Sequence, residues 1–184
     1  MAEHVCPWWM GYLLLNPLRR LLQKPTKVLD SHIKPGMVTL DVGCGMGYFS
    51  LDMARMVGPE GKVVCVDLQP KMIEALRRRA SKAGLLDRID HRVCGKRDLG
   101  LEDLGQKIDF ALVFAIVHEV PDAEFFFKQV HEALRPAGRC LLAEPKGRVS
   151  EKRFEETIAT AQRAGCELVG RPEVFRSRTA LLNR

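Results

Sequence analysis

The stretch LDVGCGMGYFS, residues 40–50, places three glycines at alternate positions directly after an apolar run. Glycine adds conformational entropy to the unfolded chain and has no side chain to pack, so such a cluster needs a structural reason. Gly43, Gly45 and Gly47 suit a backbone that turns sharply or lets a ligand come close. A predicted helix follows, and the free N–H groups at its start would point at that ligand. The loop therefore predicts a binding site.

An acidic residue follows the next apolar run and suggests what kind of ligand binds. The run KVVCVD, residues 62–67, ends in Asp67, and a carboxylate in this place accepts hydrogen bonds from ribose hydroxyls. The dinucleotide fingerprint GxGxxG uses its third glycine for close packing of helix on strand. That third position falls on Tyr48 here, which argues against a pyrophosphate cradle. The pattern predicts a nucleoside-containing ligand.

A histidine and two glutamates are the candidate acid–base groups. His118 and Glu119 follow the apolar run DFALVFAIV, residues 109–117. Histidine is the side chain best suited to exchange a proton near neutral pH, so His118 would serve as a general base. The alternative is that it only packs against a ligand or donates to a backbone carbonyl. Glu144 ends a further strand-like run, where a structural hydrogen bond is an equal alternative to an acid–base role.

Strands and helices alternate along the chain and must position these residues. Hydrophobic patterning predicts strands over 38–42, 62–67, 88–94, 109–117, 139–143, 167–169 and 179–182. Helices are expected over 26–33, 49–57, 70–83, 122–134 and 150–164, with Asp122 and Ser150 as N-caps, and a further short one begins at Asn16-Pro17. This alternation predicts an α/β fold, a doubly wound, mostly parallel seven-stranded sheet with helices on both faces. Ligands bind such sheets at the carboxyl ends of the strands.

Composition indicates one globular domain, residues 1–184, with residues 1–35 as a helical lid and residues 36–184 as the core. The net charge of +6 is compatible with an RNA substrate. Arg77, Arg78 and Arg79, however, are expected to form a solvated helix face. The six cysteines include no CxxC pair, so we predict no metal site. With neither a signal peptide nor a membrane span expected, we predict a cytoplasmic protein.

Four blocks in order resemble the motifs of class I S-adenosylmethionine-dependent methyltransferases. They are LDVGCGMGYFS, VVCVDLQPKMIEAL, FALVFAIVHEVPD and LRPAGRCLLAEP, and the resemblance extends over about residues 26–184. Within that family the chain is most similar to small-molecule enzymes, including the ubiquinone/menaquinone C-methyltransferases and the arsenite methyltransferases. The resemblance implies a Rossmann-like fold with S-adenosyl-L-methionine as cofactor.

The resemblance also implies which residues hold that cofactor. Asp67 would hold the two ribose hydroxyls, and the loop would hold the methionine part. Gly95 and Lys96 stand where family members often carry an acidic and a small residue at the adenine edge, so backbone groups or Asp98 would serve there. The full implied set is Tyr12, Asp41, Gly43, Cys44, Gly45, Gly47, Asp67, Leu68, Met72, Gly95, Lys96, Phe114 and Ala115, with His118 and Glu119 as catalytic candidates.

The lid is expected to carry the acceptor-binding surface, because Trp8 and Trp9 offer aromatic area and Tyr12 would reach the cofactor carboxylate. The alternative is that both tryptophans pack on the sheet edge or form a dimer contact. We therefore expect methyl transfer to a small, partly apolar molecule. The alternatives are an RNA methyltransferase, a non-catalytic cofactor-binding protein and an NAD-dependent oxidoreductase. A metalloid acceptor would need several thiolates, of which only Cys44 and Cys6 suggest themselves.

Overall fold

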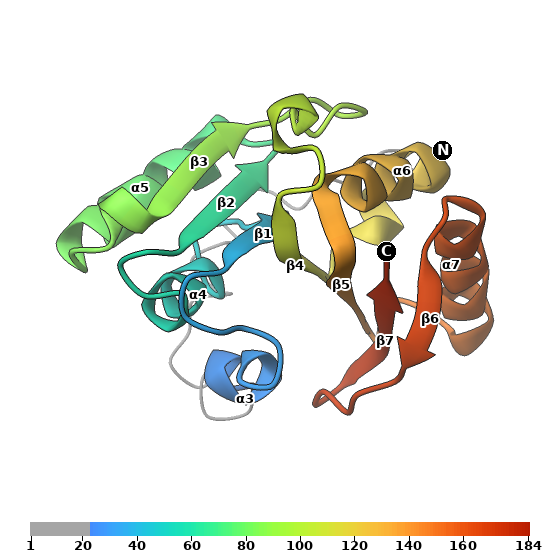
Figure 1. Cartoon of the computed structure of the whole chain (residues 1–184). Helices are drawn as coiled ribbons and strands as arrows, with labels where there is room; N and C mark the ends of the chain where they lie inside the picture. Colours follow the sequence, from blue (N-terminus) through green and yellow to red (C-terminus); the bar gives the residue numbers. More distant parts are fainter. Residues whose placement is uncertain (1–22) are drawn as a thin grey trace. The chain divides into compact units, whose positions relative to one another are not determined.

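The computed structural model describes residues 23–184, so Tyr12, both tryptophans and the helix expected at Asn16-Pro17 lie outside the described residues. The chain forms two compact units, one ending at Cys94 and the other running from Gly95 to Arg184. Figure 1 shows strands alternating with helices in each unit. None of the helices in residues 23–184 is long and apolar enough to cross a membrane.

The first unit contains a parallel three-stranded arrangement in the order β3-β2-β1. Its strands are nearly continuous apolar runs, and side chains of β1 and β2 are buried along almost their whole length, as expected for parallel strands covered on both faces. The elements are α3 (Pro25–Leu29), β1 (Val38–Val42), α4 (Ser50–Met56), β2 (Lys62–Asp67), α5 (Pro70–Lys82) and β3 (Ile89–Val93), with a 3-10 turn at Leu86–Arg88.

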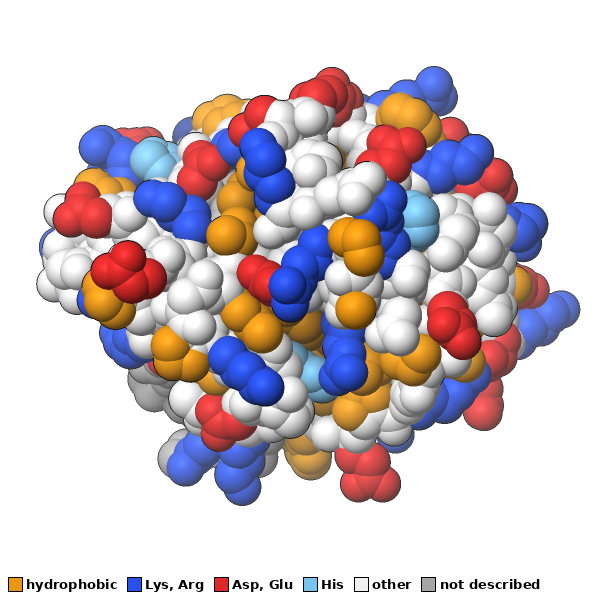
Figure 2. Space-filling view, viewed as in Figure 1, with side chains coloured by type: hydrophobic (Ala, Val, Ile, Leu, Met, Phe, Trp, Pro, Cys, Tyr) orange, Lys and Arg blue, Asp and Glu red, His pale blue; other side chains and the backbone are white. Residues whose placement is uncertain are grey.

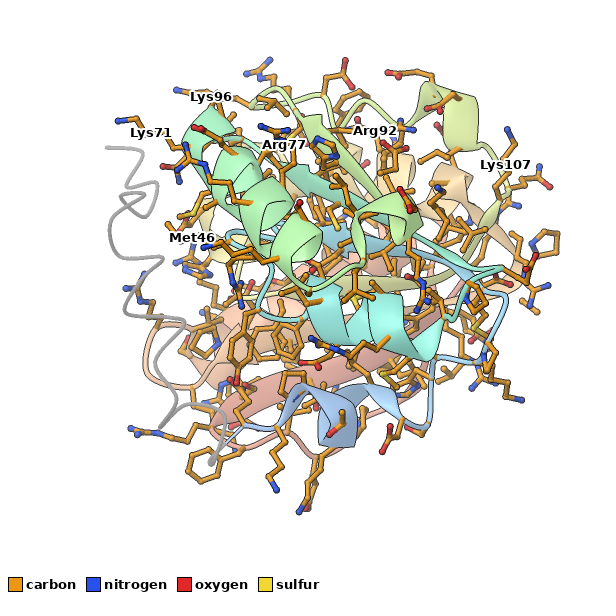
Figure 3. All side chains as sticks on the ribbon, turned by 90° about the vertical axis from the view of Figure 1, so that its left-hand side faces the viewer. Met46, Lys71, Arg77, Arg92, Lys96 and Lys107 are labelled. Carbon is orange, nitrogen blue, oxygen red and sulfur yellow. The ribbon has the colours of Figure 1, made fainter. Side chains whose placement is uncertain are left out.

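The helix α5 packs against β2 and β3 through one apolar face. It begins with Pro70, whose fixed φ suits a first turn, and it buries Ile73, Leu76 and Ala80. Gly84 follows the helix in the left-handed conformation, with φ +66°, and ends it. Figure 3 shows Lys71 extending away from this helix. The amphipathic pattern therefore predicted α5 correctly to within a residue.

The second unit contains four strands in the order β4-β5-β7-β6. β4 and β5 are parallel, whereas β7 is antiparallel to both of its neighbours, β5 and β6. The elements are β4 (Ile108–Phe114), α6 (Ala123–Ala133), β5 (Leu134–Pro145), α7 (Glu151–Arg163), β6 (Glu167–Gly170) and β7 (Ser177–Asn183), with 3-10 turns at Glu102–Leu104 and Val117–Glu119.

Both long helices of this unit have the N-caps predicted from sequence. The side chain of Asp122 accepts a hydrogen bond from the N–H of Phe125 at 3.0 Å, and that of Ser150 accepts one from the N–H of Arg153 at 3.3 Å. Each cap satisfies one of the free N–H groups of a first helical turn. The two helices also contact each other.

Three element boundaries differ from the sequence prediction by three residues or more. β4 ends at Phe114 rather than at residue 117, because Ala115 adopts a left-handed φ of +58° and a 3-10 turn follows. β5 begins at Leu134, which pairs with Ile108 across a register shift, rather than at residue 139. α3 ends at Leu29 rather than at residue 33. At β4 and β5 the pairing of distant residues overrides the local pattern.

Candidate functional site

The glycine loop follows β1 in the first unit, and all three of its glycines have a left-handed backbone. The φ angles are +71° at Gly43, +54° at Gly45 and +80° at Gly47. A Cβ at Gly47 would come within 2.4 Å of Leu76 Cδ1 on α5, so this glycine permits close packing of loop on helix. A Cβ at Gly45 would meet no atom within 4 Å, so this glycine faces open space. Of the two, Gly45 is therefore the one at which a ligand can approach the backbone.

Asp67 joins the end of β2 to this loop. Its Oδ2 accepts a hydrogen bond from the N–H of Gly45 at 2.9 Å, and its Oδ1 accepts one from the N–H of Gln69 at 2.8 Å. Each oxygen of a carboxylate has two lone pairs and can accept more than one hydrogen bond. The structure thus gives Asp67 a role that the sequence did not suggest, which is to brace the loop that it stands beside.

Asp41, the fourth residue of β1, lies beneath the loop and is 3% exposed. Burial raises the pKa of its carboxyl from 3.8 to about 7, and the charge of Asp67 adds to this rise. The Ser50 hydroxyl donates a hydrogen bond to Asp41 Oδ2 at 2.5 Å and lowers the pKa in part. A buried carboxyl of this kind gains its charge readily when a cation binds beside it.

Cys44 has the character of a packed thiol. It is 5% exposed, and its Sγ–H donates to the carbonyl of Gly45 at 3.7 Å. Burial raises its pKa well above the ordinary value, which disfavours the thiolate that binds metals and metalloids. Among residues 23–184, no group of three or more His, Cys, Asp and Glu side chains is arranged to hold a metal ion.

A basic residue of α5 also holds the loop. Arg79 Nη1 donates a hydrogen bond to the carbonyl oxygen of Met46, and Figure 3 shows Met46 beside α5. Arg78 pairs instead with Glu74 one turn away, and Arg77 is exposed. The prediction of a solvated helix face is therefore correct for Arg77 and Arg78 and wrong for Arg79. Sequence reasoning missed this contact, since three consecutive arginines do not reveal which one faces inward.

The other residues assigned to cofactor binding lie in three places. Leu68 and Met72 follow Asp67 directly, and the Met72 side chain is buried at the start of α5. Gly95 and Lys96 begin the second unit in an exposed turn, which the N–H of Gly95 closes by donating to the carbonyl of Asp98 at 2.8 Å. Phe114 and Ala115 follow at the end of β4, half-buried. Tyr12 remains a prediction, because it lies outside the described residues.

The second unit brings His118 and Glu144 into direct contact at the ends of β4 and β5. His118 Nδ1 lies 2.6 Å from Glu144 Oε2, and Glu144 is 1% exposed. Glu119 Oε1 lies 3.7 Å from His118 Nε2 and 4.0 Å from Arg148 Nη1. The imidazole therefore stands between two carboxylates, an arrangement that can stabilise a positive charge on the ring.

A cavity of about 210 Å³ adjoins this histidine within the second unit. Its walls are aliphatic near β4 and polar along α7, where the Arg153 guanidinium also donates to the carbonyl of His118 at 3.4 Å. The lining residues include Val117, His118, Val120, Pro121, Glu144 and Arg153. The described chain thus carries a glycine–aspartate cradle in one unit and a histidine–glutamate pair beside a cavity in the other.

Comparison with known proteins agrees with this geometry. Residues 33–174 match the family described as a methyltransferase domain. The chain is 28% identical over 137 residues to a ubiquinone biosynthesis O-methyltransferase of Xanthomonas axonopodis pv. citri, covering 74% of this chain and 55% of that protein. It is 31% identical over 117 residues to a demethylmenaquinone methyltransferase of Symbiobacterium thermophilum, covering 64% of this chain and 46% of that protein. The chain thus spans about half the length of the curated relatives it matches.

A solved structure confirms the fold class. The crystal structure of a SAM-dependent methyltransferase from Aquifex aeolicus superposes with a TM-score of 0.86 at 23% identity, covering 97% of this chain and 98% of that one. The predicted Rossmann-like, mostly parallel fold with seven strands is therefore correct. The family match likewise confirms the resemblance carried by the four sequence blocks. This chain belongs to the methyltransferase-domain family.

Proposed function

We propose that this chain is an S-adenosyl-L-methionine-dependent methyltransferase that acts on a small, partly apolar molecule. The observation that carries the proposal is the pairing of an open backbone position at Gly45 with the Asp67 carboxylate that holds it. A nucleoside-bearing cation fits such a cradle, because the loop admits close approach and the carboxylate can accept ribose hydroxyls. The family match supports methyl transfer, and the SAM-dependent methyltransferase of similar fold supports the same cofactor.

Each part of the cradle has a role in this proposal. Gly43, Gly45 and Gly47 shape the loop around the amino-acid end of the cofactor, and the buried Asp41 faces a positive charge there. Leu68 and Met72 flank the adenine. When bound, the cofactor supplies an electrophilic methyl group on a sulfonium. The protein's tasks are then to align the acceptor and to exclude water.

His118 is the proposed general base, and Glu119 assists it. The Glu144 carboxylate holds His118 at Nδ1, and Glu119 stands near Nε2, so a proton taken up by the ring meets negative charge on both sides. The curated relatives named for ubiquinone and menaquinone biosynthesis suggest a quinone-type ring as the acceptor. A flat ring also suits the aliphatic residues beside His118.

Three alternatives are less well supported. A dinucleotide cradle is disfavoured by Tyr48, which fills the third fingerprint position as a buried side chain. A nucleic-acid substrate calls for a concentrated basic surface, yet acidic side chains are interspersed with basic ones on the face drawn in Figure 2. A metalloid acceptor is disfavoured by the burial of Cys44. Cys44, Cys65, Cys140 and Cys166 are free thiols, which suits the reducing cytoplasm that we propose as the location of the protein.

Thermal melting with matched ligands tests the cofactor. S-adenosylmethionine at a hundred times its dissociation constant should add about 2.7 kcal/mol to the free energy of unfolding, a rise of about 5–11 °C in Tm. We expect this rise to be lost in Asp67→Asn, because the amide replaces one of the two acceptor oxygens. Asp87→Asn, on an exposed turn of the same unit, is the matched control and should keep the rise. A rise with NAD(H) instead would overturn the proposal.

A further inference from the structure

Glu144 uses both oxygens of a buried carboxylate to hold one loop. Its Oε1 accepts hydrogen bonds from the N–H of Val117 at 2.7 Å and from the N–H of His118 at 3.4 Å. Its Oε2 faces the imidazole Nδ1 at 2.6 Å. Because backbone N–H groups can only donate, Oε1 must be an acceptor, and the orientation of the carboxyl group is fixed.

This arrangement determines which ring nitrogen of His118 carries the proton. A carboxylate oxygen at hydrogen-bond distance accepts, so Nδ1 must carry the hydrogen. In the neutral imidazole Nε2 then holds the lone pair. Nε2 is buried and has no hydrogen-bond partner within the part of the chain that the structure describes. A buried lone pair without a donor calls for a ligand that supplies one.

We infer that Glu144 is a positioning residue that fixes His118 as the Nδ1–H tautomer, and that the adjoining cavity takes an acceptor whose reacting atom carries a proton. The inference rests on the proposed function and names its substrate class, a hydroxyl or an acidic C–H such as a hydroquinone bears. An acceptor whose reacting atom carries no proton, such as a thioether or a tertiary amine, needs no base and would leave Nε2 without a donor.

The cavity fits part of such a molecule. Its volume of about 210 Å³ lies below the range of about 300–1,000 Å³ for whole drug-sized ligands, so it suits a small ring. Val117, Val120, Pro121 and Val149 supply apolar wall. Arg153, at the polar side, carries the positive charge that would favour an ionised oxygen.

The chemical step balances with the groups named. With the methyl donor bound, the acceptor atom would give its proton to His118 Nε2 and take the methyl group, and the donor sulfur would keep the electron pair of the bond that breaks. The positive charge lost by the sulfonium would then be carried by the imidazolium, between the carboxylates of Glu144 and Glu119.

Glu144→Gln tests the tautomer without any cofactor. The glutamine oxygen must stay with the N–H groups of Val117 and His118, so its NH₂ faces Nδ1 and forces the proton onto Nε2. ¹⁵N NMR of histidine-labelled protein should therefore show Nδ1 protonated in the wild type and Nε2 protonated in the variant. Glu173→Gln, an exposed residue of the same unit, is the control and should leave the wild-type pattern unchanged. An unchanged tautomer in Glu144→Gln would overturn the inference.

A second measurement tests the acceptor class. Anaerobic titration with 1,4-naphthohydroquinone should shift the His118 Nε2 resonance of the wild-type protein, while dimethyl sulfide should not. The shift should be lost in Glu144→Gln, although that variant should still gain Tm with S-adenosylmethionine. No shift with the hydroquinone would overturn the assignment of the cavity. Failure of the wild-type protein to bind S-adenosylmethionine would instead overturn the proposed function, and the tautomer result would stand apart from it.

Discussion

Gly45 and Gly47 share a left-handed backbone but differ in what an added side chain would meet. A methyl group at Gly45 would enter open space, whereas one at Gly47 would overlap Leu76, which is fully buried on α5. Gly84 provides a reference, because it also has a positive φ and open space but lies at the end of α5. Alanine substitutions at the three positions therefore distinguish the effects of backbone strain, side-chain packing and ligand approach.

We expect Gly45→Ala and Gly84→Ala each to lower the free energy of unfolding by about 1–2 kcal/mol, the strain of a left-handed alanine. Gly47→Ala should cost about 1–3 kcal/mol more, because the new methyl group overpacks against Leu76. Urea unfolding measures these differences. Isothermal titration should show that Gly45→Ala loses S-adenosylmethionine and Gly84→Ala keeps it. Equal stability of the Gly47 and Gly84 variants would contradict the packing role.

Asp41 couples the stability of the first unit to pH. Its pKa is raised to about 7 in the folded protein, from 3.8, so the folded state binds the proton more tightly than the unfolded state does. The stabilisation by this proton is complete below pH 4 and is lost as the pH rises through 7. Above pH 7 the carboxyl is ionised in both states and its contribution is constant.

Asp41→Asn should remove this dependence. Between pH 4 and pH 7 the wild-type free energy of unfolding should fall relative to that of the variant by on the order of 4 kcal/mol, since each pKa unit is worth about 1.4 kcal/mol. Urea unfolding of both proteins across this range measures the difference. Asp87→Asn, an exposed carboxyl in the same unit, should follow the wild type. A constant difference between wild type and Asp41→Asn would show that the carboxyl titrates at its ordinary pKa.

At the scale of elements, the start of α6 closes the loop that carries His118. The turn over residues 117–119 is followed within a few residues by Asp122, whose side chain caps the helix. The cap satisfies the N–H of Phe125 and places a negative charge at the positive end of the helix. The loop is thus held at one side by Glu144 of β5 and at the other by the capped helix.

Asp122→Ala should lower the free energy of unfolding by about 1 kcal/mol, because the N–H of Phe125 loses its partner. Asp122→Asn keeps an acceptor oxygen and should cost less. Chemical denaturation of the three proteins under the same buffer conditions measures both changes. If the asparagine variant were as unstable as the alanine variant, the charge rather than the hydrogen bond would carry the effect.

At the scale of the whole molecule, burial shields nearly all of the described cysteines from reagents in solvent. Cys44, Cys65, Cys140 and Cys166 are buried, and only Cys94 among residues 23–184 is half-exposed. Burial raises the pKa of Cys166 to about 11 and also raises the pKa of Cys140 well above its ordinary value. Because the thiolate is the reactive form, these thiols should be inert while the fold is intact.

In a Cys6→Ser background, which removes the cysteine outside the described residues, a thiol reagent such as dithionitrobenzoate should label Cys94 quickly at pH 8. The other four should react only in denaturant. The time course of absorbance measures the rate of labelling, and mass spectrometry of the labelled peptides identifies which cysteines have reacted. Rapid labelling of Cys44 in the folded protein would contradict its burial and would reopen the metalloid alternative.

Features that depend only on neighbouring residues could be predicted from the amino-acid sequence. Apolar runs and amphipathic spacing located the strands and helices to within a few residues, and side-chain chemistry identified the caps Asp122 and Ser150. The glycine loop and the aspartate after the second strand indicated a nucleoside site. These patterns are readable because a strand, a cap or a tight turn is specified within a short window of the chain.

Contacts between groups that lie far apart in the sequence could not be predicted without the folded structure. His118 and Glu144 are 26 positions apart, and Gly45 and Asp67 are 22 apart, yet each pair is joined by a hydrogen bond. The raised pKa of Asp41 likewise arises from burial, which no local pattern reports. The physical reason is that strand register and helix packing bring these side chains together, and both depend on the summed contacts of the folded chain rather than on any one segment.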